Sequence, residues 1–198
     1  MLPSLTTRLV TPRLLLRPPR TGDVAELRRL LRANQEHLRP WNPAPAVGED
    51  PSSITEVSKT VLRQRRDWKH GAGFVFMVAE RERPDRFIGK IALNGIMRGA
   101  MHGAYLGYWM AAEQQGKGLV TEAIAAVLDF GFGSAGLHRI QAAIMPRNER
   151  SLHVIEKLAF RREGYAERYL QIAGKWEDHI LFARTREEHV GEKLAADR

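Results

Sequence analysis

The order of apolar and polar positions along the chain predicts strands and helices from one end to the other. Segments in which apolar residues run continuously or alternate with polar ones are expected to be strands. Segments in which they recur every three or four positions are expected to be helices. The predicted strands are Leu9–Pro19, Gly73–Ala79, Phe87–Leu93, Tyr105–Met110, His138–Met145, Phe160–Gln171 and Lys175–Phe182. The predicted helices start near Val24, Pro51, Val120 and Asn148.

This order gives one strand, two helices, three strands, a helix, a strand, a helix and two strands. It is typical of the α/β class in its α+β form, with one mixed sheet and helices on both faces. A chain of 198 residues suits one domain. We predict that this domain spans residues 8–185 and that residues 186–198 form a charged surface tail.

The segment Gln115–Val120 joins a predicted strand to a predicted helix and contains Gly116 and Gly118. The first N–H groups of a helix have no partner within the helix, and the helix dipole adds partial positive charge there. Glycines leave these N–H groups open to a ligand. The segment therefore predicts a site for an anionic group such as a phosphate. A glycine turn with a purely structural role is the alternative.

Two known phosphate-binding patterns do not fit this segment. The Walker loop needs Ser or Thr after Gly116-Lys117, where this chain has Gly118. The dinucleotide fingerprint needs Gly or Ala at the position of Thr121.

A second polar motif, Asn148-x-x-Ser151, lies on the first turn of the last predicted helix. Residues three apart on a helix are neighbours, so the two side chains project close to one another. Asparagine is a favoured N-cap residue, and local chemistry therefore predicts that Asn148 caps this helix.

Composition narrows the possible functions. The chain has no cysteine, which excludes disulfides, thiolate metal sites and a cysteine nucleophile. It has neither an apolar run of the ~20 residues needed to span a bilayer nor a signal-peptide core at its N-terminus, and we expect a cytoplasmic protein. The net charge of +8 favours polyanionic surroundings such as a ribosome or nucleic acid, although a solvated basic surface explains it equally well.

The pattern Gln115-x-x-Gly118-x-Val120 resembles the acetyl-CoA pyrophosphate loop of the GNAT superfamily of N-acetyltransferases, with Val120 in place of the usual small residue. Other segments resemble the branch of that superfamily that acetylates the N-terminal alanine of a ribosomal protein. The resemblance covers roughly residues 13–184. Its segments are Glu36–Trp41, Gly107–Trp109, His138–Ile140, Asn148-x-x-Ser151, Phe160–Ala166, Tyr169-Leu170 and Gly174–His179.

The resemblance implies a mostly antiparallel sheet that splays at a cofactor cleft, with acetyl-CoA as cosubstrate and no metal. It implies that Asn148 holds the pantetheine arm and that the Ser151 hydroxyl donates to the leaving thiolate. The amine attacks directly, and a backbone N–H near Met110 or Ala111 binds the carbonyl oxygen. The cofactor-binding residues implied in this way are Met110, Ala111, Gln115, Gly116, Lys117, Gly118, Leu119, Val120, Asn148 and Ser151.

The residue that accepts the proton of the amine is left open. Many relatives carry Glu where this chain has Tyr105, and tyrosine, with a pKa of about 10, is a poor base at neutral pH. Glu36, His37 and His102 are further candidates, and so is a base that acts through water. Trp41 either lines the acceptor groove or anchors a loop.

The acceptor predicted from the resemblance is the N-terminal α-amino group of a ribosomal protein. Its pKa of about 7.7–8.0, against about 10.4 for lysine, leaves more of it neutral at pH 7. A small-molecule amine such as a drug, polyamine or amino acid is the first alternative. A non-catalytic RNA- or ribosome-binding module is the second, favoured by the basic stripe Arg63–Lys69. The sequence is also compatible with a homodimer.

Overall fold

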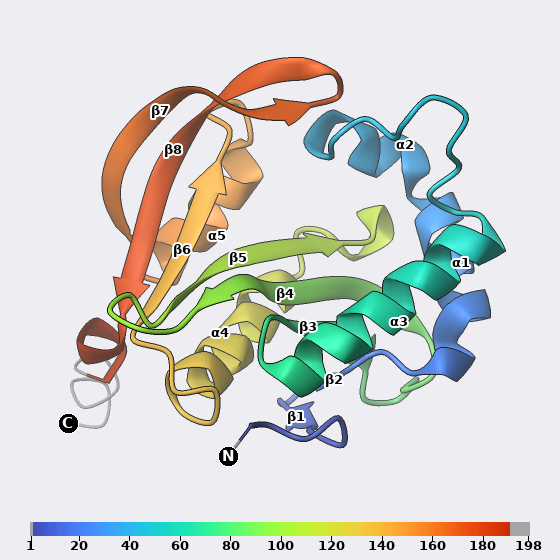
Figure 1. Ribbon diagram of the computed structural model, residues 1–198, viewed down its shortest axis with the longest axis horizontal. Coiled ribbons are helices and arrows are strands. Elements are labelled where there is room, and N and C mark those ends of the chain that lie inside the picture. The colour runs from blue at the N-terminus through green and yellow to red at the C-terminus, as the bar shows by residue number, and fades with distance from the viewer. Residues whose placement is uncertain (1, 191–198) are drawn as a thin grey trace.

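Within residues 2–190, which the computed structural model describes, eight strands form one sheet in the order β1-β2-β3-β4-β5-β6-β8-β7 (Figure 1). Neighbouring strands are antiparallel except β5 and β6, which are parallel. The predicted class and the mostly antiparallel sheet are confirmed. The strands are β1 Leu9–Val10, β2 Leu14–Arg17, β3 Phe74–Glu80, β4 Phe87–Met97, β5 Gly103–Met110, β6 Arg139–Ile144, β7 Arg161–Ile172 and β8 Lys175–Thr185. The helices are α1 Val24–Ala33, α2 Gln35–Leu38, α3 Ile54–His70, α4 Leu119–Phe132 and α5 Glu149–Lys157, with 3-10 turns η1 Thr21–Asp23, η2 Arg39–Trp41 and η3 Ala112–Gln114.

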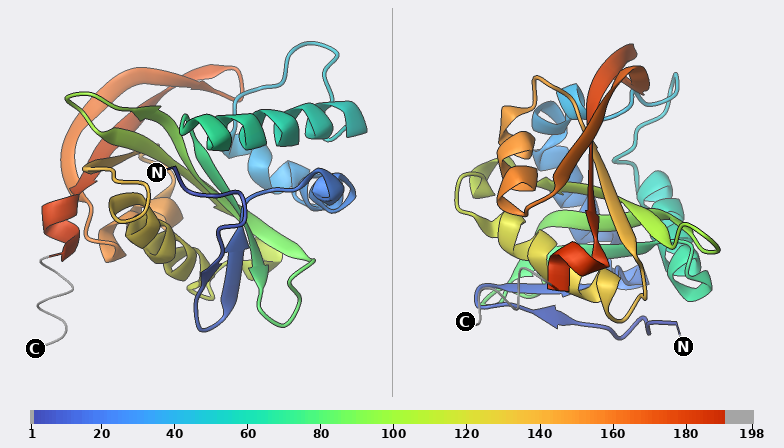
Figure 2. Two further views of the ribbon diagram at one scale, coloured as in Figure 1. Left: turned by 60° about the horizontal axis from the view of Figure 1, so that its bottom comes forward. Right: turned by 90° about the vertical axis from the view of Figure 1, so that its left-hand side faces the viewer.

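Helices cover both faces of the sheet, as predicted. Helices α1 and α3 lie on one face, and α4 and α5 lie on the other (Figures 1 and 2). Strand β3 is buried between these layers: Phe76 packs against Phe130 of α4 with ring centroids 5.0 Å apart, whereas Met77 joins a cluster with Val57 and Val61 of α3. Because both faces of β3 are covered, its sequence is a continuous apolar run rather than an alternation.

The N-terminal segment corrects one prediction. Two short strands form in place of the single strand predicted at Leu9–Pro19, and β1 pairs with β2 so that Leu9 faces Leu16. The break falls at Pro12, which has no N–H to give to a strand ladder. The Thr11 N–H donates to the Leu14 carbonyl at 3.0 Å and closes the turn. A turn this short is not visible in the alternation of apolar residues.

The C-terminal segment corrects the predicted start of the tail. Residues 186–190 are helical, and His189 is buried. Its Nε2 lies 2.6 Å from Oδ1 of Asp129 in α4, and its ring lies 5.0 Å from that of Phe132. The first residues of the predicted tail therefore pack on the domain. Residues 191–198 of that prediction lie outside the described residues.

The sheet is open between the carboxyl ends of β5 and β6. Residues 103–105 pair with residues 139–141, after which β5 stays beside β4 up to Met110 and β6 stays beside β8 up to Ile144. This divergence is the predicted splay. Carboxyl ends of parallel strands are the usual place for a ligand in open α/β sheets, and the gap between β5 and β6 is therefore the first candidate site.

Candidate active site

The open edge of β5 presents backbone donors to the gap. The Ala111 N–H donates to the Ile88 carbonyl of β4 at 2.7 Å. Backbone N–H groups alternate between the two sides of a strand, so the N–H of Met110 points away from β4 and toward β6. The sequence named Met110 and Ala111 as alternative donors to the carbonyl oxygen, and the structure distinguishes them. The Ala111 N–H is hydrogen-bonded within the sheet, whereas the Met110 N–H faces the gap.

The glycine loop turns from β5 into α4 as predicted. Gly116 has a φ of 74° and Gly118 a φ of 73°, and Gly118 is the N-cap of α4. In this left-handed region any other residue is strained, by about 1–2 kcal/mol. A Cβ at Gly116 would meet nothing within 4 Å, so glycine is required there by backbone conformation rather than by crowding. The first helical bond comes from the Glu122 N–H to the Gly118 carbonyl at 3.1 Å, which leaves the preceding N–H groups without a helical partner.

An anchor that sequence analysis missed holds this loop to the N-terminal hairpin. Oε1 of Glu122 in α4 accepts from the Thr11 hydroxyl at 2.6 Å and from the Arg13 N–H at 3.0 Å. The Arg13 guanidinium donates to Glu122 Oε2 at 2.6 Å and to the Lys117 carbonyl at 2.9 Å. Burial raises the pKa of Glu122, but these hydrogen bonds and the Arg13 charge outweigh it and lower the pKa below its ordinary value.

Asn148 and Ser151 lie together at the start of α5, on the other side of the gap. Asn148 Oδ1 accepts the Ser151 N–H at 3.2 Å, so Asn148 caps α5 as local chemistry predicted. The Tyr108 hydroxyl of β5 donates to the Ser151 carbonyl at 3.3 Å. Burial raises the pKa of Tyr108 to about 12, and the tyrosine therefore remains a neutral donor at physiological pH.

Gln115 joins the glycine loop to both α2 and α5. Its Oε1 accepts from the Arg150 guanidinium, and its Nε2 lies 2.8 Å from Nε2 of His37. The arginine can only donate, which fixes the amide with its NH₂ group toward His37. His37 Nε2 must then accept, and the imidazole carries its proton on Nδ1. The His37 nitrogen nearest the loop is therefore already occupied.

The remaining base candidates differ in position. Tyr105 is the last residue of β5 that pairs with β6, and its side chain is 40% exposed. The Glu36 side chain is 80% exposed and pairs with Arg39. His102 precedes β5, at the end of the strand opposite the gap, and its carbonyl accepts from the His138 N–H at 2.7 Å. The fold therefore places His102 away from the gap, whereas Tyr105 and His37 border it.

Trp41 is held by a contact that local sequence did not suggest. Arg147, in the loop between β6 and α5, places its guanidinium carbon 4.9 Å from the centre of the Trp41 ring. The same guanidinium donates to the Pro40 carbonyl at 3.1 Å and to Glu177 of β8 at 2.9 Å. Trp41 is thereby fixed beside the carboxyl end of β6.

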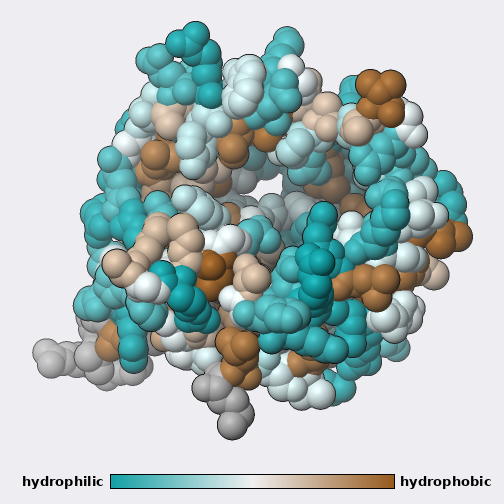
Figure 3. All heavy atoms as spheres, in the orientation of Figure 1, coloured by the Kyte–Doolittle hydropathy of each residue, from teal (hydrophilic) through white to brown (hydrophobic). Residues whose placement is uncertain are grey.

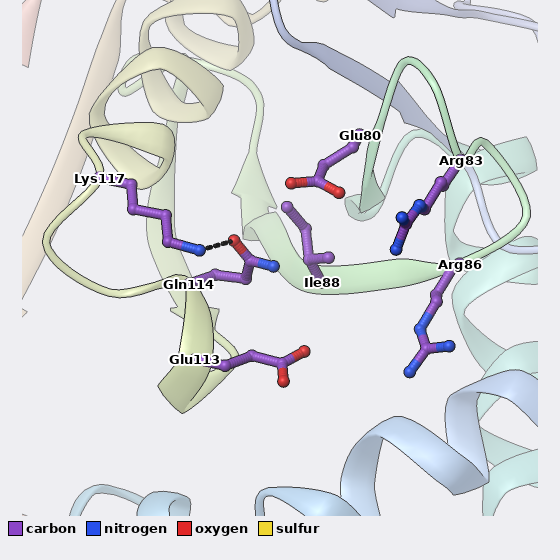
Figure 4. A pocket seen from close by; sticks show the side chains of 7 residues that line it. All are labelled: Glu80, Arg83, Arg86, Ile88, Glu113, Gln114 and Lys117. Carbon is purple, nitrogen blue, oxygen red and sulfur yellow. Dashed lines mark hydrogen bonds between the residues drawn. The ribbon is translucent and has the colours of Figure 1, made fainter.

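A cavity of about 290 Å³ lies beside the glycine loop but outside the gap (Figure 4). None of its lining residues belongs to β6 or α5. Lys117 points toward it and donates to Gln114 Oε1 at 2.9 Å, so this predicted cofactor-binding side chain turns away from the gap. The lining residues are Glu80, Arg83, Arg86, Ile88, Glu113, Gln114 and Lys117.

Two further kinds of site were sought in the described part of the chain. No group of three or more His, Cys, Asp or Glu residues within residues 2–190 is arranged to hold a metal ion. No helix in the same range is both long and apolar enough to cross a bilayer.

A sheet open between two parallel strands, with a helix start whose first N–H groups have no helical partner at the mouth of the opening, is the arrangement that the resemblance to CoA-dependent acetyltransferases implied. Comparison with known proteins leads to the same class. A family model described as an acetyltransferase (GNAT) domain matches residues 13–161. The chain is 34% identical over 178 residues to the ribosomal protein uS5-alanine N-acetyltransferase of Escherichia coli (strain K12), with 90% of each chain covered.

Solved structures resemble the whole fold. RimJ of Mycobacterium smegmatis in complex with CoA-disulfide has a TM-score of 0.82 at 35% identity, covering 93% of this chain and 90% of that one. A ribosomal-protein-S5-alanine acetyltransferase from Vibrio fischeri has a TM-score of 0.85 at 31% identity, covering 92% and 98%. The chain therefore belongs to the GNAT family and is an N-acetyltransferase.

Proposed function

We propose that this protein transfers the acetyl group of acetyl-CoA to the N-terminal α-amino group of a ribosomal protein, of the type that begins with alanine. The observation that carries the proposal is the likeness over 90% of the chain to an enzyme named for that reaction. The gap between β5 and β6 and the glycine loop at its mouth support the same chemistry.

The residues around the gap fit acetyl-CoA. The N–H groups of Gly116, Gly118, Leu119 and Val120, at the positive end of the α4 dipole, would receive the diphosphate. The Met110 N–H would bind the acetyl carbonyl oxygen and polarise the bond to its carbon. Asn148 uses Oδ1 to cap α5, which leaves its NH₂ group for a carbonyl of the pantetheine arm.

The transfer needs no covalent intermediate on the protein. The amine nitrogen attacks the acetyl carbon, an N–C bond forms and the C–S bond breaks. The thiolate that leaves accumulates negative charge and takes a proton. The Ser151 hydroxyl is the donor in our scheme and takes a proton back from solvent water, with its main chain held by Asn148 and by Tyr108.

The absence of a carboxylate at Tyr105 favours an α-amine as acceptor. With a pKa of about 7.7–8.0, an α-amino group is partly neutral at pH 7 and can attack without a strong base. A lysine with a pKa of about 10.4 is almost fully charged and needs one. In this scheme water passes the proton of the amine to solvent along the Tyr105 side of the gap.

Mass spectrometry tests the proposal. The purified protein and acetyl-CoA are incubated with unacetylated uS5, with other ribosomal proteins that begin with serine or methionine, and with a panel of small amines that includes spermidine and an aminoglycoside. We expect uS5 to gain one acetyl group at its N-terminus. Acetylation of a small amine with uS5 unchanged would overturn the ribosomal assignment and support the small-molecule alternative.

A further inference from the structure

A short segment between α1 and α3, which carries Glu36, His37 and Trp41, closes the gap into a ring. We call residues 35–42 the strap; it contains α2, η2 and Asn42. It leaves α1 at Asn34, a buried residue whose Oδ1 accepts the Ala112 N–H at 2.9 Å just beyond β5. In Figure 1 the strap lies between the end of β5 and the tip of the β7–β8 hairpin.

Contacts at the two ends of the strap reach the glycine loop and the β7–β8 hairpin. His37 lies 2.8 Å from Gln115 of the glycine loop, and Gln115 also binds Arg150 of α5. At the other end of the strap, the Asn42 carbonyl accepts the Ala173 N–H of the hairpin tip at 2.9 Å. The strap is thus joined to the glycine loop, through Gln115 to α5, and at its other end to the hairpin. Figure 3 shows a hollow at the centre of this face, which Figure 1, in the same orientation, places between β5, α5 and α2.

Arg147 closes these contacts into a circuit. Its guanidinium stacks on Trp41, donates to the Pro40 carbonyl and pairs with Glu177, and so connects the strap, the β6–α5 loop and β8. Arg147 and Glu177 keep 44% and 26% of their side-chain exposure, and an ion pair this exposed adds little stability. A cation beside the N-terminus of α5 also opposes the helix dipole. The contacts of Arg147 therefore contribute little to the folding stability of the protein. They are better explained by the position in which they hold the strap.

We propose that Arg147 is a positioning residue that holds the strap over the gap, and that the closed ring admits an acceptor only end-on, as the free end of an extended chain. A closed ring is crossed by one strand of polypeptide but not by a chain that must enter as a doubled loop. The identity of the transferred group rests on the proposed function, whereas the closure of the ring does not.

Steady-state kinetics test the positioning role. The acceptor is a synthetic decapeptide that begins with alanine and otherwise contains glycine, serine and one tyrosine. Arg147→Ala is expected to raise KM for this peptide by about tenfold or more and to leave KM for acetyl-CoA within about twofold. Arg147→Lys keeps the charge but loses the planar guanidinium that stacks on Trp41 and bridges to Glu177. Its KM for the peptide should fall between those of the parent protein and Arg147→Ala. Arg162→Ala, an exposed arginine of β7, is the matched control and should match the parent protein.

A branched peptide tests end-on entry with the same chemistry. Alanine is joined through its carboxyl group to the ε-amine of a central lysine in a peptide with both ends blocked, so that its free α-amine stands on a short side arm. The parent protein should acetylate the linear decapeptide at least about tenfold faster than the branched one, and Arg147→Ala should narrow this ratio. Equal rates for both peptides with the parent protein would overturn end-on entry.

Hydrogen–deuterium exchange separates this inference from the proposed function. In the protein without ligands, the amides of Arg39, Trp41 and Asn42 should exchange faster in Arg147→Ala than in the parent protein, while those of α4 stay the same. Unchanged exchange in residues 39–42, or equal peptide KM values for Arg147→Ala and an active parent, would overturn the role of Arg147. If the parent protein acetylates no peptide but Arg147→Ala still exchanges faster than the parent protein, the proposed function is overturned and the ring is kept.

Discussion

At the scale of single residues, Gly118 combines a conformational requirement with a place next to the proposed diphosphate site. Its φ of 73° places it in the left-handed region, and it caps the helix whose first N–H groups we propose to receive the diphosphate. We expect Gly118→Val to weaken CoA binding at least about tenfold, because the side chain strains the turn and occupies the space of the diphosphate. Isothermal titration calorimetry measures the dissociation constant.

Gly136→Val is the matched control for that experiment. Gly136 also has a positive φ, 61°, but lies beyond the C-terminal end of α4. Both variants should lose a similar amount of stability, about 1–2 kcal/mol from the left-handed strain. Only Gly118→Val should lose affinity for CoA, and an unaltered dissociation constant would contradict the proposed diphosphate site.

Ser151 offers a test of the chemical step. Ser151→Ala removes the hydroxyl but keeps the backbone N–H that Asn148 accepts, so the helix cap survives. We expect kcat to fall by roughly 10²-fold with the affinity for acetyl-CoA unchanged. Ser134→Ala, at an exposed turn, should behave like the parent protein. Equal turnover for Ser151→Ala and the parent protein would remove Ser151 from the mechanism.

At the scale of elements, the N-terminus of α5 has two roles that one substitution separates. Asn148→Asp keeps an oxygen to cap the helix, whereas Asn148→Ala loses it at a cost of about 1 kcal/mol. Neither variant has the NH₂ group proposed to hold the pantetheine arm. We expect thermal unfolding to show that Asn148→Asp keeps the stability of the parent protein and that Asn148→Ala loses part of it. The kcat/KM for acetyl-CoA should be reduced in both variants. Full activity of the Asp variant would contradict the proposed contact.

The anchor between the β1–β2 hairpin and α4 predicts a pH dependence of stability. The pKa of Glu122 is lowered in the folded protein, so the folded state binds a proton there more weakly than the unfolded chain does. The stabilisation is fully present above the ordinary carboxyl pKa of about 4.3 and is lost as pH falls through the lower folded value. We expect Glu122→Gln to lose about 1–2 kcal/mol of unfolding free energy at pH 7.

Urea unfolding across the acid range checks this expectation. The difference in stability between the parent protein and Glu122→Gln should shrink as pH falls below about 4.3. Glu82→Gln, in the exposed turn between β3 and β4, should follow the parent protein at every pH. A difference that stays constant down to low pH would show that the Glu122 charge does not contribute.

At the scale of the whole molecule, the net charge of +8 predicts salt-dependent action on ribosomal particles. A positive protein is steered toward a polyanionic particle, and salt screens that attraction. We expect kcat/KM on small ribosomal subunits with unacetylated uS5 to fall by roughly tenfold or more from low to high salt. The neutral decapeptide should show little change under the same conditions. Parallel salt curves for the two acceptors would show that the basic surface does not guide encounter.

The local features of the fold and the site were predictable because they depend on neighbouring residues. Apolar spacing located α1, α3, α4, α5 and most strands but not α2, the glycines located the start of α4, and the cap at Asn148 follows from its own side chain. The β1–β2 hairpin was missed because its turn is short and resembles the strands around it. The helical residues 186–190 were missed because their sequence is charged, and only the contacts of His189 with Asp129 and Phe132 explain their place.

The sequence by itself determined the fold class and the glycine turn at the start of α4, since periodicity and backbone conformation act over a few residues. Only the tertiary structure decided which donors face the gap, that Gln115 joins His37 to Arg150, and that Arg147 holds the strap. These partners lie tens of residues apart in the chain, as in the contact of Arg13 with Glu122 across 109 positions. They meet because the order of strands in the sheet brings their elements together, and no short pattern of residues encodes that order.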